Sequence, residues 1–539
     1  MKYRIDITSD AVKRAEAMSV RELLYHVCCP DYGVLEDRKI LDTASAFIHA
    51  GDSGFHSEIT GRIKDACSAA PLITTDLEAG PGSMISDGTQ FPSFYSCSVA
   101  GDSGLAYEMG EAAAVEGREL GYNWTLGPAV DICANPDTPT TGLRGAGRTV
   151  SEAVEYGSAY ISGCQRNGMI ATAKHFPGDG FGIYDQHLTT PEIPLSLEEW
   201  RKTSGVVYKE VINSGVMSIM IGHLSFPAFD EPDPLNGEYP PATLSERIIR
   251  DLLIDDLGFE GLIISDAVQM VGFSGFMNYY EACARFLEAG GDILLFAYPD
   301  SQFVDQLQLL IKAGKLHRRT LINRAARIIS FREQLPAVFY QAPEMLHREK
   351  HEETARELIR ASIQVVRDRK KLLPLEECGG KGVLHLILTV PGFKRMPLLK
   401  SFSAELDSYF HSVEEWIDPG KRRMVEAAEN KSFDIIICSL GNEYNFGTNV
   451  IRFHGVQSRN FMGGWAHMGI PVLFISHYHP FTHLEYRGLM DTVINTNGTV
   501  LATLPILADM ICGKKELNYG ETTDRYRDWT LRGWLKDQL

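Results

Sequence analysis

The segment TLSERIIRDLLIDDLGFEGLIISDA, residues 243–267, contains one complete unit of a pattern that recurs along the chain. Apolar residues at helical spacing follow a capping-box motif, Thr243-Leu244-Ser245-Glu246, and predict an amphipathic helix. Those apolar residues are Ile248, Ile249, Leu252, Leu253 and Leu257. Gly258 is placed to end the helix, and the apolar run Gly261–Ile264 predicts a buried strand that leads directly to Asp266.

The same order of short apolar run, Gly- or Asp-rich loop and helical pattern extends from about Leu23 to Ser330. The predicted strands are Pro71–Thr75, Trp124–Pro128, Met169–Ala173, Ser218–Ile221, Gly261–Ile264 and Asp292–Phe296. Strands that alternate with helices favour a parallel sheet, and about six to eight units favour a closed (β/α)8 TIM-like barrel. An open doubly wound sheet is the alternative that periodicity leaves open.

The pattern loosens between Glu333 and Arg348, where Pro336 and Pro343 indicate a linker. We therefore expect a catalytic barrel over residues 1–335, a linker over 336–350 and a smaller α/β sandwich domain over 351–539. In that domain the pattern predicts a helix at Glu352–Val366 and strands at Val383–Val390, Phe433–Leu440, Ile470–Ser476 and Thr492–Asn495.

Composition excludes several classes of protein. With 44% hydrophobic and 23% charged residues the chain resembles ordinary globular proteins. The net charge of -18 argues against nucleic acid as a partner, because phosphate binding needs a basic surface. No run approaches the roughly 20 apolar residues of a membrane span. The polar start, Met1–Asp6, and ten scattered cysteines without a Cys-x-x-Cys pair predict a cytoplasmic protein. Its oligomeric state is not predicted.

Ionisable side chains stand in three loops that follow predicted strands, at Thr75–Gly80, Lys174–His187 and Ile263–Met270. Asp266 in the third loop either caps the next helix or faces the barrel mouth, where catalytic groups of such barrels gather. Local sequence favours neither interpretation.

Asp185 and His187 are two residues apart, so on an extended segment both side chains point the same way. The carboxylate could hold the imidazole and favour its protonated form, which can donate a proton to a leaving group near neutral pH. An exposed polar loop is the alternative. Lys174, His175 and Arg144 could grip sugar hydroxyls or form structural ion pairs.

Lys174-His175-Phe176-Pro177-Gly178, followed at this distance by Asp185-x-His187, resembles glycoside hydrolase family 3, and more narrowly its β-N-acetylglucosaminidase branch. The segments Pro241–Ser245, Gly258-Phe259-x-Gly261 and Ser265-Asp266-Ala267 are similar to the approach to that family's nucleophile. The resemblance covers about Met18 to Phe296. Ala355 to Leu375 is more loosely similar to the start of the family's sandwich domain.

This resemblance implies a retaining exo-β-N-acetylglucosaminidase acting on a small-molecule or oligosaccharide substrate. Asp266 would be the nucleophile, and His187, oriented by Asp185, would be the general acid and base. The resemblance also implies a set of sugar-binding residues: Asp76, Asp131, Arg144, Lys174, His175 and His223. It implies no cofactor and no metal.

Several positions depart from the family pattern. Asp179 and Phe181 stand in a stretch that usually reads Gly-His-Gly-Asp-Thr. Gln186 is the central residue between Asp185 and His187, the predicted dyad, where the family usually has serine. Ala79 and Pro81 stand where the family usually has Gly and Arg. These changes leave the substrate open. The alternatives are a phosphorylase of the same glycosides, a β-glucosidase or β-xylosidase, and a sugar-binding protein on a decayed glycosidase fold.

The segment His477-Tyr478-His479-Pro480-Phe481-Thr482-His483 has a spacing that could hold a metal ion. It follows a predicted strand of the second domain, away from the barrel motifs. We predict no metal site there.

Overall fold

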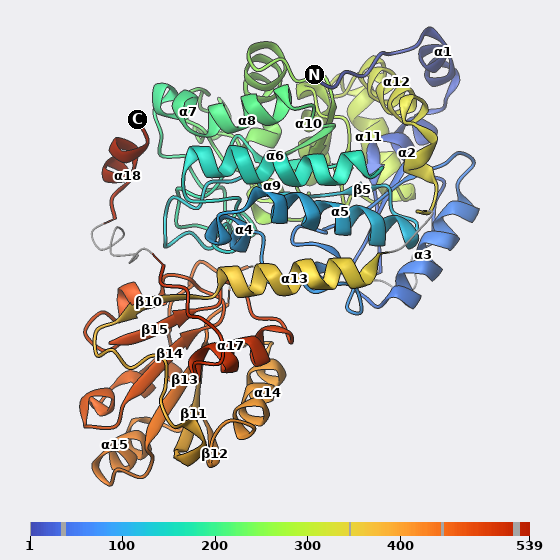
Figure 1. Ribbon diagram of the computed structural model, residues 1–539. Helices are drawn as coiled ribbons and strands as arrows, with labels where there is room; N and C mark the ends of the chain where they lie inside the picture. The colour runs from blue at the N-terminus through green and yellow to red at the C-terminus, as the bar shows by residue number, and fades with distance from the viewer. Residues whose placement is uncertain (1, 34–38, 344–346, 444–446, 521–528) are drawn as a thin grey trace.

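The computed structural model describes residues 2–33, 39–343, 347–443, 447–520 and 529–539. It shows an α/β protein in two parts, with the long helix α13 (Arg348–Ser362) between them (Figure 1). Residues 344–346 of the predicted linker lie outside the described residues.

The strands of the first part pair in parallel. They are β1 (Cys28–Cys29), β2 (Asp31–Tyr32), β3 (Ser45–Ile48), β4 (Leu72–Thr75), β5 (Trp124–Thr125), β6 (Thr172–Phe176), β7 (Ser218–Ile221), β8 (Leu262–Ser265) and β9 (Leu294–Leu295). They form three sheets, β2-β3-β4-β5, β6-β7-β8 and β1-β9. Single parallel bridges, Trp124 with Ile170 and Ile264 with Ile293, connect these sheets. The six predicted strands all overlap observed ones, whereas β1 to β3 were not predicted.

From β3 onward helices separate successive strands along the chain. The helices of this part are α1 (Ser9–Ala17), α2 (Val20–Val27), α3 (Ser53–Ala66), α4 (Tyr95–Ala100), α5 (Ser103–Glu119), α6 (Val150–Arg166), α7 (Leu197–Lys202), α8 (Ser204–Asn213), α9 (Val271–Ser274), α10 (Tyr279–Ala289), α11 (Ser301–Lys312) and α12 (Arg318–Gln334). Short turns of helix are η1 (Pro81–Ser83), η2 (Ala242–Leu244) and η4 (Ala337–Tyr340). Strands and helices share one apolar core.

The unit at residues 243–267 forms a helix and a strand as predicted, but the helix begins later. The helix η3 (Arg247–Asp256) is a π-helix whose apolar face is buried, and Gly258 follows it with a φ of 70°. The predicted capping box is wrong, because Thr243 lies in η2 and its hydroxyl bonds to His223. Ser245 Oγ instead accepts the Ile248 amide at 3.1 Å.

The second part contains a six-stranded sheet in the order β10-β15-β14-β13-β11-β12. Its strands are β10 (Gln364–Asp368), β11 (Gly382–Thr389), β12 (Ser412–Ile417), β13 (Ile435–Gly441), β14 (Val472–Ser476) and β15 (Thr492–Asn495). All pairs are parallel except β10 with β15. The four predicted strands are confirmed. The predicted helix Glu352–Val366 is wrong at its end, where residues 364–366 begin β10.

Helices cover both faces of this sheet. On one face lie α14 (Met396–Asp407) and α17 (Thr503–Ile511), and on the other α15 (Lys421–Glu429), η6 (Gln457–Phe461) and η7 (Trp465–His467). Two short helices, η5 (Cys378–Gly380) and α16 (Thr482–Glu485), complete this part. Successive strand residues alternate between the two apolar cores, as a sheet buried on both faces requires.

Two helices tie the parts together. Leu358 of α13 joins the first core and Ile359 the second. The C-terminal helix α18 (Leu531–Gln538) lies against the first part (Figure 1), where the Trp534 indole donates to Arg148 O at 3.0 Å. Within the described ranges, no helix is both long and apolar enough to cross a membrane.

Candidate active site

Asp266 lies immediately after β8, at the carboxyl end of the strand. Its amide donates to Ile221 O at 2.8 Å, and its Oδ1 accepts the Ala267 amide at 2.7 Å. The next helix, α9, begins only at Val271, with Met270 as its N-cap. Asp266 therefore caps no helix, and as a residue it is 9% exposed.

Basic side chains surround the Asp266 carboxylate. The closest measured approach is His175 Nε2, at 3.9 Å from Asp266 Oδ2. Burial by itself would raise the pKa of Asp266, but the charges of the neighbouring basic groups outweigh it and the pKa lies below its ordinary value. The largest of these charges comes from His175, and His187 and Lys174 also contribute. The carboxylate is thus ionised near neutral pH.

His175 is oriented from behind by Asp131. Asp131 Oδ2 accepts the hydrogen bond of His175 Nδ1 at 2.7 Å, and Asp131 Oδ1 accepts the backbone amides of His175 and Asp179 at 3.1 and 2.8 Å. The side chain of Asp131 is fully buried. Asp131 therefore fixes which ring nitrogen of His175 faces Asp266.

Lys174 belongs to an ionic cluster next to the Asp131–His175 pair. Its ammonium lies 2.5 Å from Glu78 Oε1 and 2.9 Å from Asp76 Oδ1. Arg144 holds Glu78 through two bonds, Nε to Oε2 at 2.8 Å and Nη2 to Oε1 at 2.7 Å. Burial opposes ionisation of Glu78, but both cations outweigh it and hold its pKa far below the ordinary value. Asp76 is the most exposed member, with 35% of its side chain accessible.

His223 contacts both Ala267, which follows Asp266, and the loop that carries Asp185 and His187, which we call the dyad loop. Its Nε2 lies 3.0 Å from Ala267 O, and since a carbonyl only accepts, this nitrogen carries the proton. Its Nδ1 then accepts from the Thr243 hydroxyl at 3.0 Å. Burial lowers the pKa of His223, which is consistent with a neutral ring. The His223 amide donates to Gln186 Oε1 at 2.8 Å, so Gln186 ties the dyad loop to β7.

Asp185 and His187 form the predicted contact. Asp185 Oδ1 accepts from His187 Nδ1 at 2.6 Å and from the His187 amide at 2.8 Å. The Asp185 side chain is fully buried, whereas 27% of the His187 ring is exposed. The bond places the proton on Nδ1, so Nε2 is the nitrogen that can exchange a proton with a bound substrate.

The departures from the family pattern have structural roles. Gly180, which lies between two of them and keeps the family's glycine, has a φ of 105°, and a Cβ there would lie 1.9 Å from Ile132 O, so only glycine fits. Phe181 packs edge-on against Trp534 of α18 with ring centroids 5.5 Å apart. Thr140 Oγ1 donates to Asp179 Oδ2 at 2.6 Å. The sequence placed Glu78 in the Thr75–Gly80 loop and Gln186 between Asp185 and His187, but it indicated no role for either.

The buried carboxyl group of Asp179 should make the stability of the protein depend on pH. Burial, together with the neighbouring Asp131, raises the pKa of Asp179 to about 6. A carboxyl whose pKa is raised in the folded state favours folding at low pH and opposes it increasingly as the pH rises toward that value. Wild-type protein should therefore lose about 2 kcal/mol of unfolding free energy from this group between about pH 4.5 and about pH 7. Asp179→Asn should lack this loss.

Urea unfolding of both proteins at the two pH values measures the difference. Asp65→Asn, a substitution of an exposed carboxylate on α3, is the matched control and should follow wild type. Equal pH dependence of Asp179→Asn and wild type would contradict the assignment.

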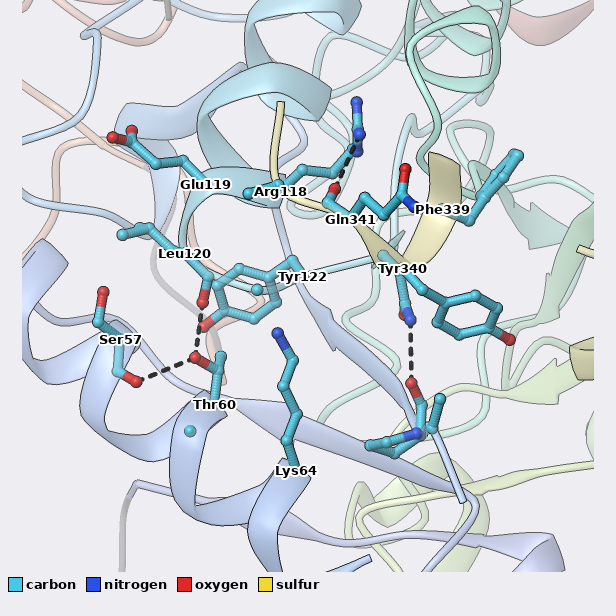
Figure 2. Close-up of a pocket in the computed structure, with 16 residues that line it drawn as sticks. Ser57, Thr60, Lys64, Arg118, Glu119, Leu120, Tyr122, Phe339, Tyr340 and Gln341 are labelled. Carbon is cyan, nitrogen blue, oxygen red and sulfur yellow. Dashed lines mark hydrogen bonds between the residues drawn. The ribbon is translucent and has the colours of Figure 1, made fainter. Parts of the chain in front are cut away.

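A separate pocket of about 480 Å³ lies at the opposite ends of the strands (Figure 2). It is lined by Pro71 and Asn123, which directly precede β4 and β5, and the Lys64 side chain extends into it. None of the predicted site residues lines this pocket. It is therefore not the candidate active site.

The histidine-rich segment of the second part is packed against the sheet. The His477 ring lies between Ser439 Oγ at 2.9 Å and Thr499 Oγ1 at 2.8 Å. Burial lowers the pKa of His477 to about 3. Among the described residues, no three His, Cys, Asp or Glu side chains are grouped to hold a metal ion.

Comparison with known proteins identifies the family. The model of the glycosyl hydrolase family 3 N-terminal domain matches residues 53–331, more than half of the chain. The protein belongs to glycoside hydrolase family 3, and the resemblance predicted from the sequence is confirmed.

Two curated relatives carry related names. A "Beta-N-acetylglucosaminidase/beta-glucosidase" of Cellulomonas fimi is 28% identical over 465 residues, which cover 82% of this chain and 81% of that protein. A "Beta-hexosaminidase A" of Pseudoalteromonas piscicida is 28% identical over 300 residues, covering 52% of this chain and 50% of the relative.

Solved structures resemble nearly the whole chain. "Beta-glucoside phosphorylase BglX" is 27% identical with a TM-score of 0.86, and the match covers 97% of both chains. A family 3 β-N-acetylglucosaminidase from Paenibacillus sp. is 22% identical with a TM-score of 0.79, covering 93% of this chain and 98% of the other. The latter likeness shows the fold alone.

Proposed function

We propose that the protein is a retaining exo-β-N-acetylglucosaminidase with Asp266 as its nucleophile. The observation that carries the proposal is an ionised, nearly buried carboxylate at a strand end, among basic groups that include His187, whose partner Asp185 is buried. Asp266 would attack the anomeric carbon to form a glycosyl-enzyme, while His187 Nε2–H protonates the departing oxygen. His187 would then take a proton from water, which releases the sugar with retained configuration.

We infer that the first part is a closed (β/α)8 TIM-like barrel. Besides the bridges already described, β1 pairs with β9 and β2 with β3, so pairing can run from the last strand back to the first. The division into residues 1–335, 336–350 and 351–539 remains our proposal for the domains, with α13 and α18 packed against the barrel.

The remaining site residues would bind the sugar. Lys174, Arg144 and Asp76, which form ion pairs within the cluster, would bind hydroxyls, and Asp131 would act through His175. His223 would support the loop that follows Asp266 through Ala267 O. The substrate preference for N-acetylglucosamine rests on the histidine in place of an acid carboxylate and on the names of the curated relatives.

A phosphorylase of the same glycosides is the second candidate. Neutral His187 carries no negative charge, so it would not repel phosphate as a carboxylate would, and the Asp185 carboxylate beside it is fully buried. A solved structure that covers 97% of the chain at 27% identity is described as a β-glucoside phosphorylase.

Aryl β-glycosides assayed with and without phosphate would test the proposal. We expect release of free N-acetylglucosamine in phosphate-free buffer, with slower turnover of the glucoside and the xyloside. Turnover only with phosphate, yielding a sugar 1-phosphate, would replace hydrolysis by phosphorolysis. Calorimetric sugar binding without turnover of any glycoside would support the non-catalytic alternative.

A further inference from the structure

The segment Gly447–Asn449 of the second domain reaches the dyad loop of the barrel. It follows β13, which pairs with β11, and β12 lies on the other side of β11. The chain therefore changes direction across the sheet between β11 and β13, and loops at the carboxyl ends of such strands border a natural binding crevice. Here the Asp185–His187 loop of the barrel contacts a loop from that edge.

The contacts centre on Asp185. Asp185 Oδ2 accepts the backbone amide of Gly447 at 2.9 Å and that of Thr448 at 3.1 Å. Asn449 Oδ1 accepts the Asp185 amide at 2.6 Å. One carboxylate oxygen thus contacts His187 and the other contacts the second domain.

These bonds matter because the carboxylate is buried. An ionised carboxylate removed from water is costly unless hydrogen-bond donors replace the water. Burial favours the neutral form of Asp185, yet the bonds from His187 and the Gly447 amide outweigh it and lower the pKa of Asp185. The charge that orients His187 and stabilises its protonated ring therefore depends on groups contributed by both domains.

We propose that Gly447–Asn449 belongs to the acid–base apparatus and that Asn449 is a positioning residue for His187, acting through Asp185. This inference rests on the proposed role of His187. It gives the second domain a function in which no side chain of that domain needs to touch the substrate. Asn449 is the testable group, because the other two contacts come from the backbone.

Other bonds between the domains avoid the dyad and supply a control. The hydroxyls of Ser93 and Ser96 both donate to Asn497 O, at 2.6 and 2.7 Å. Arg452 pairs with Asp137 at 2.5 Å. The double variant Ser93→Ala with Ser96→Ala would loosen domain contact without altering any bond of Asp185.

The experiment compares leaving groups in the full-length protein. For Asn449→Ala we expect kcat to fall roughly tenfold with an alkyl glycoside and less than about twofold with a dinitrophenyl glycoside. The dinitrophenolate leaving group departs as an anion and needs no proton, whereas an alkyl leaving group does. The double serine variant should keep the wild-type pattern.

Three results would overturn the proposal: equal losses with both leaving groups, an unchanged Asn449→Ala enzyme, or the same selective loss in the serine variant. His187→Ala, measured beside them, distinguishes a failure of the positioning role of Asn449 from a failure of the proposed function. If His187→Ala shows the selective loss and Asn449→Ala does not, only the positioning role fails. If His187→Ala lacks it, the proposed function fails as well.

Discussion

Replacement of Asp266 by asparagine should reduce hydrolysis of an aryl β-N-acetylglucosaminide by roughly ten-thousand-fold or more. The amide keeps the size of the side chain but removes the charge and the nucleophilic oxygen. Because the wild-type carboxylate is nearly buried among basic groups, its ionised form is available near neutral pH. The other carboxylates that contact these imidazoles, Asp131 and Asp185, are fully buried and bonded to ring nitrogens, so neither should substitute for it.

Steady-state kinetics and trapping would measure this effect. A slow fluorinated glycoside should label wild-type protein on the peptide that contains Asp266 and leave Asp266→Asn unlabelled. Asp255→Asn, a change at an exposed carboxylate on η3, should behave as wild type. Asp266→Asn protein that kept most of its activity, or a label on another peptide, would refute the assignment.

His187→Ala should produce the second largest loss, and this loss should depend on the leaving group. Positioned acids contribute roughly 100- to 10,000-fold, so alkyl glycosides should lose that much. Dinitrophenyl glycosides need little protonation, and their bond cleavage should change less than about tenfold. The reason is geometric: Asp185 holds the His187 proton on Nδ1 and so reserves Nε2 for the substrate.

A series of aryl and alkyl glycosides, with kcat plotted against leaving-group pKa, would measure the dependence. The slope should be steeper for His187→Ala than for wild type. His317→Ala, a change at a ring whose side chain is 69% exposed, is the control and should leave the slope unchanged. An equal loss across the series would mean that His187 supports the fold or binding rather than proton transfer.

Sequence patterns predicted the elements that have strong periodicity. The strands at Ser218–Ile221 and Thr492–Asn495 agree residue by residue with β7 and β15, and every residue of both is buried. The strands β1 and β2 were missed because each spans two residues, with Pro30 between them. The edge strand β12 was missed because most of its residues are polar or partly exposed.

The motif positions of the candidate site were found, but several partnerships were not. The contact between Asp185 and His187 was expected on an extended segment, whereas it forms in a turn in which Asp185 Oδ1 also accepts the His187 amide. The pairs His175 with Asp131 and Lys174 with Glu78 join segments that are far apart in sequence. Neither periodicity nor local spacing carries information about such pairs.

The sequence by itself indicated the alternation of strands and helices and the strand-end position of Asp266, because these depend on neighbouring residues and on the fixed periods of helix and strand. Only the tertiary structure decided that Asp266 faces His175 rather than capping a helix, and that Gly447–Asn449 meets Asp185. Both contacts are made by residues in loops of irregular backbone. The contact between Gly447 and Asp185 also joins residues that are about half of the chain length apart in sequence. Their geometry is set by how the two parts of the protein pack together, which no local pattern encodes.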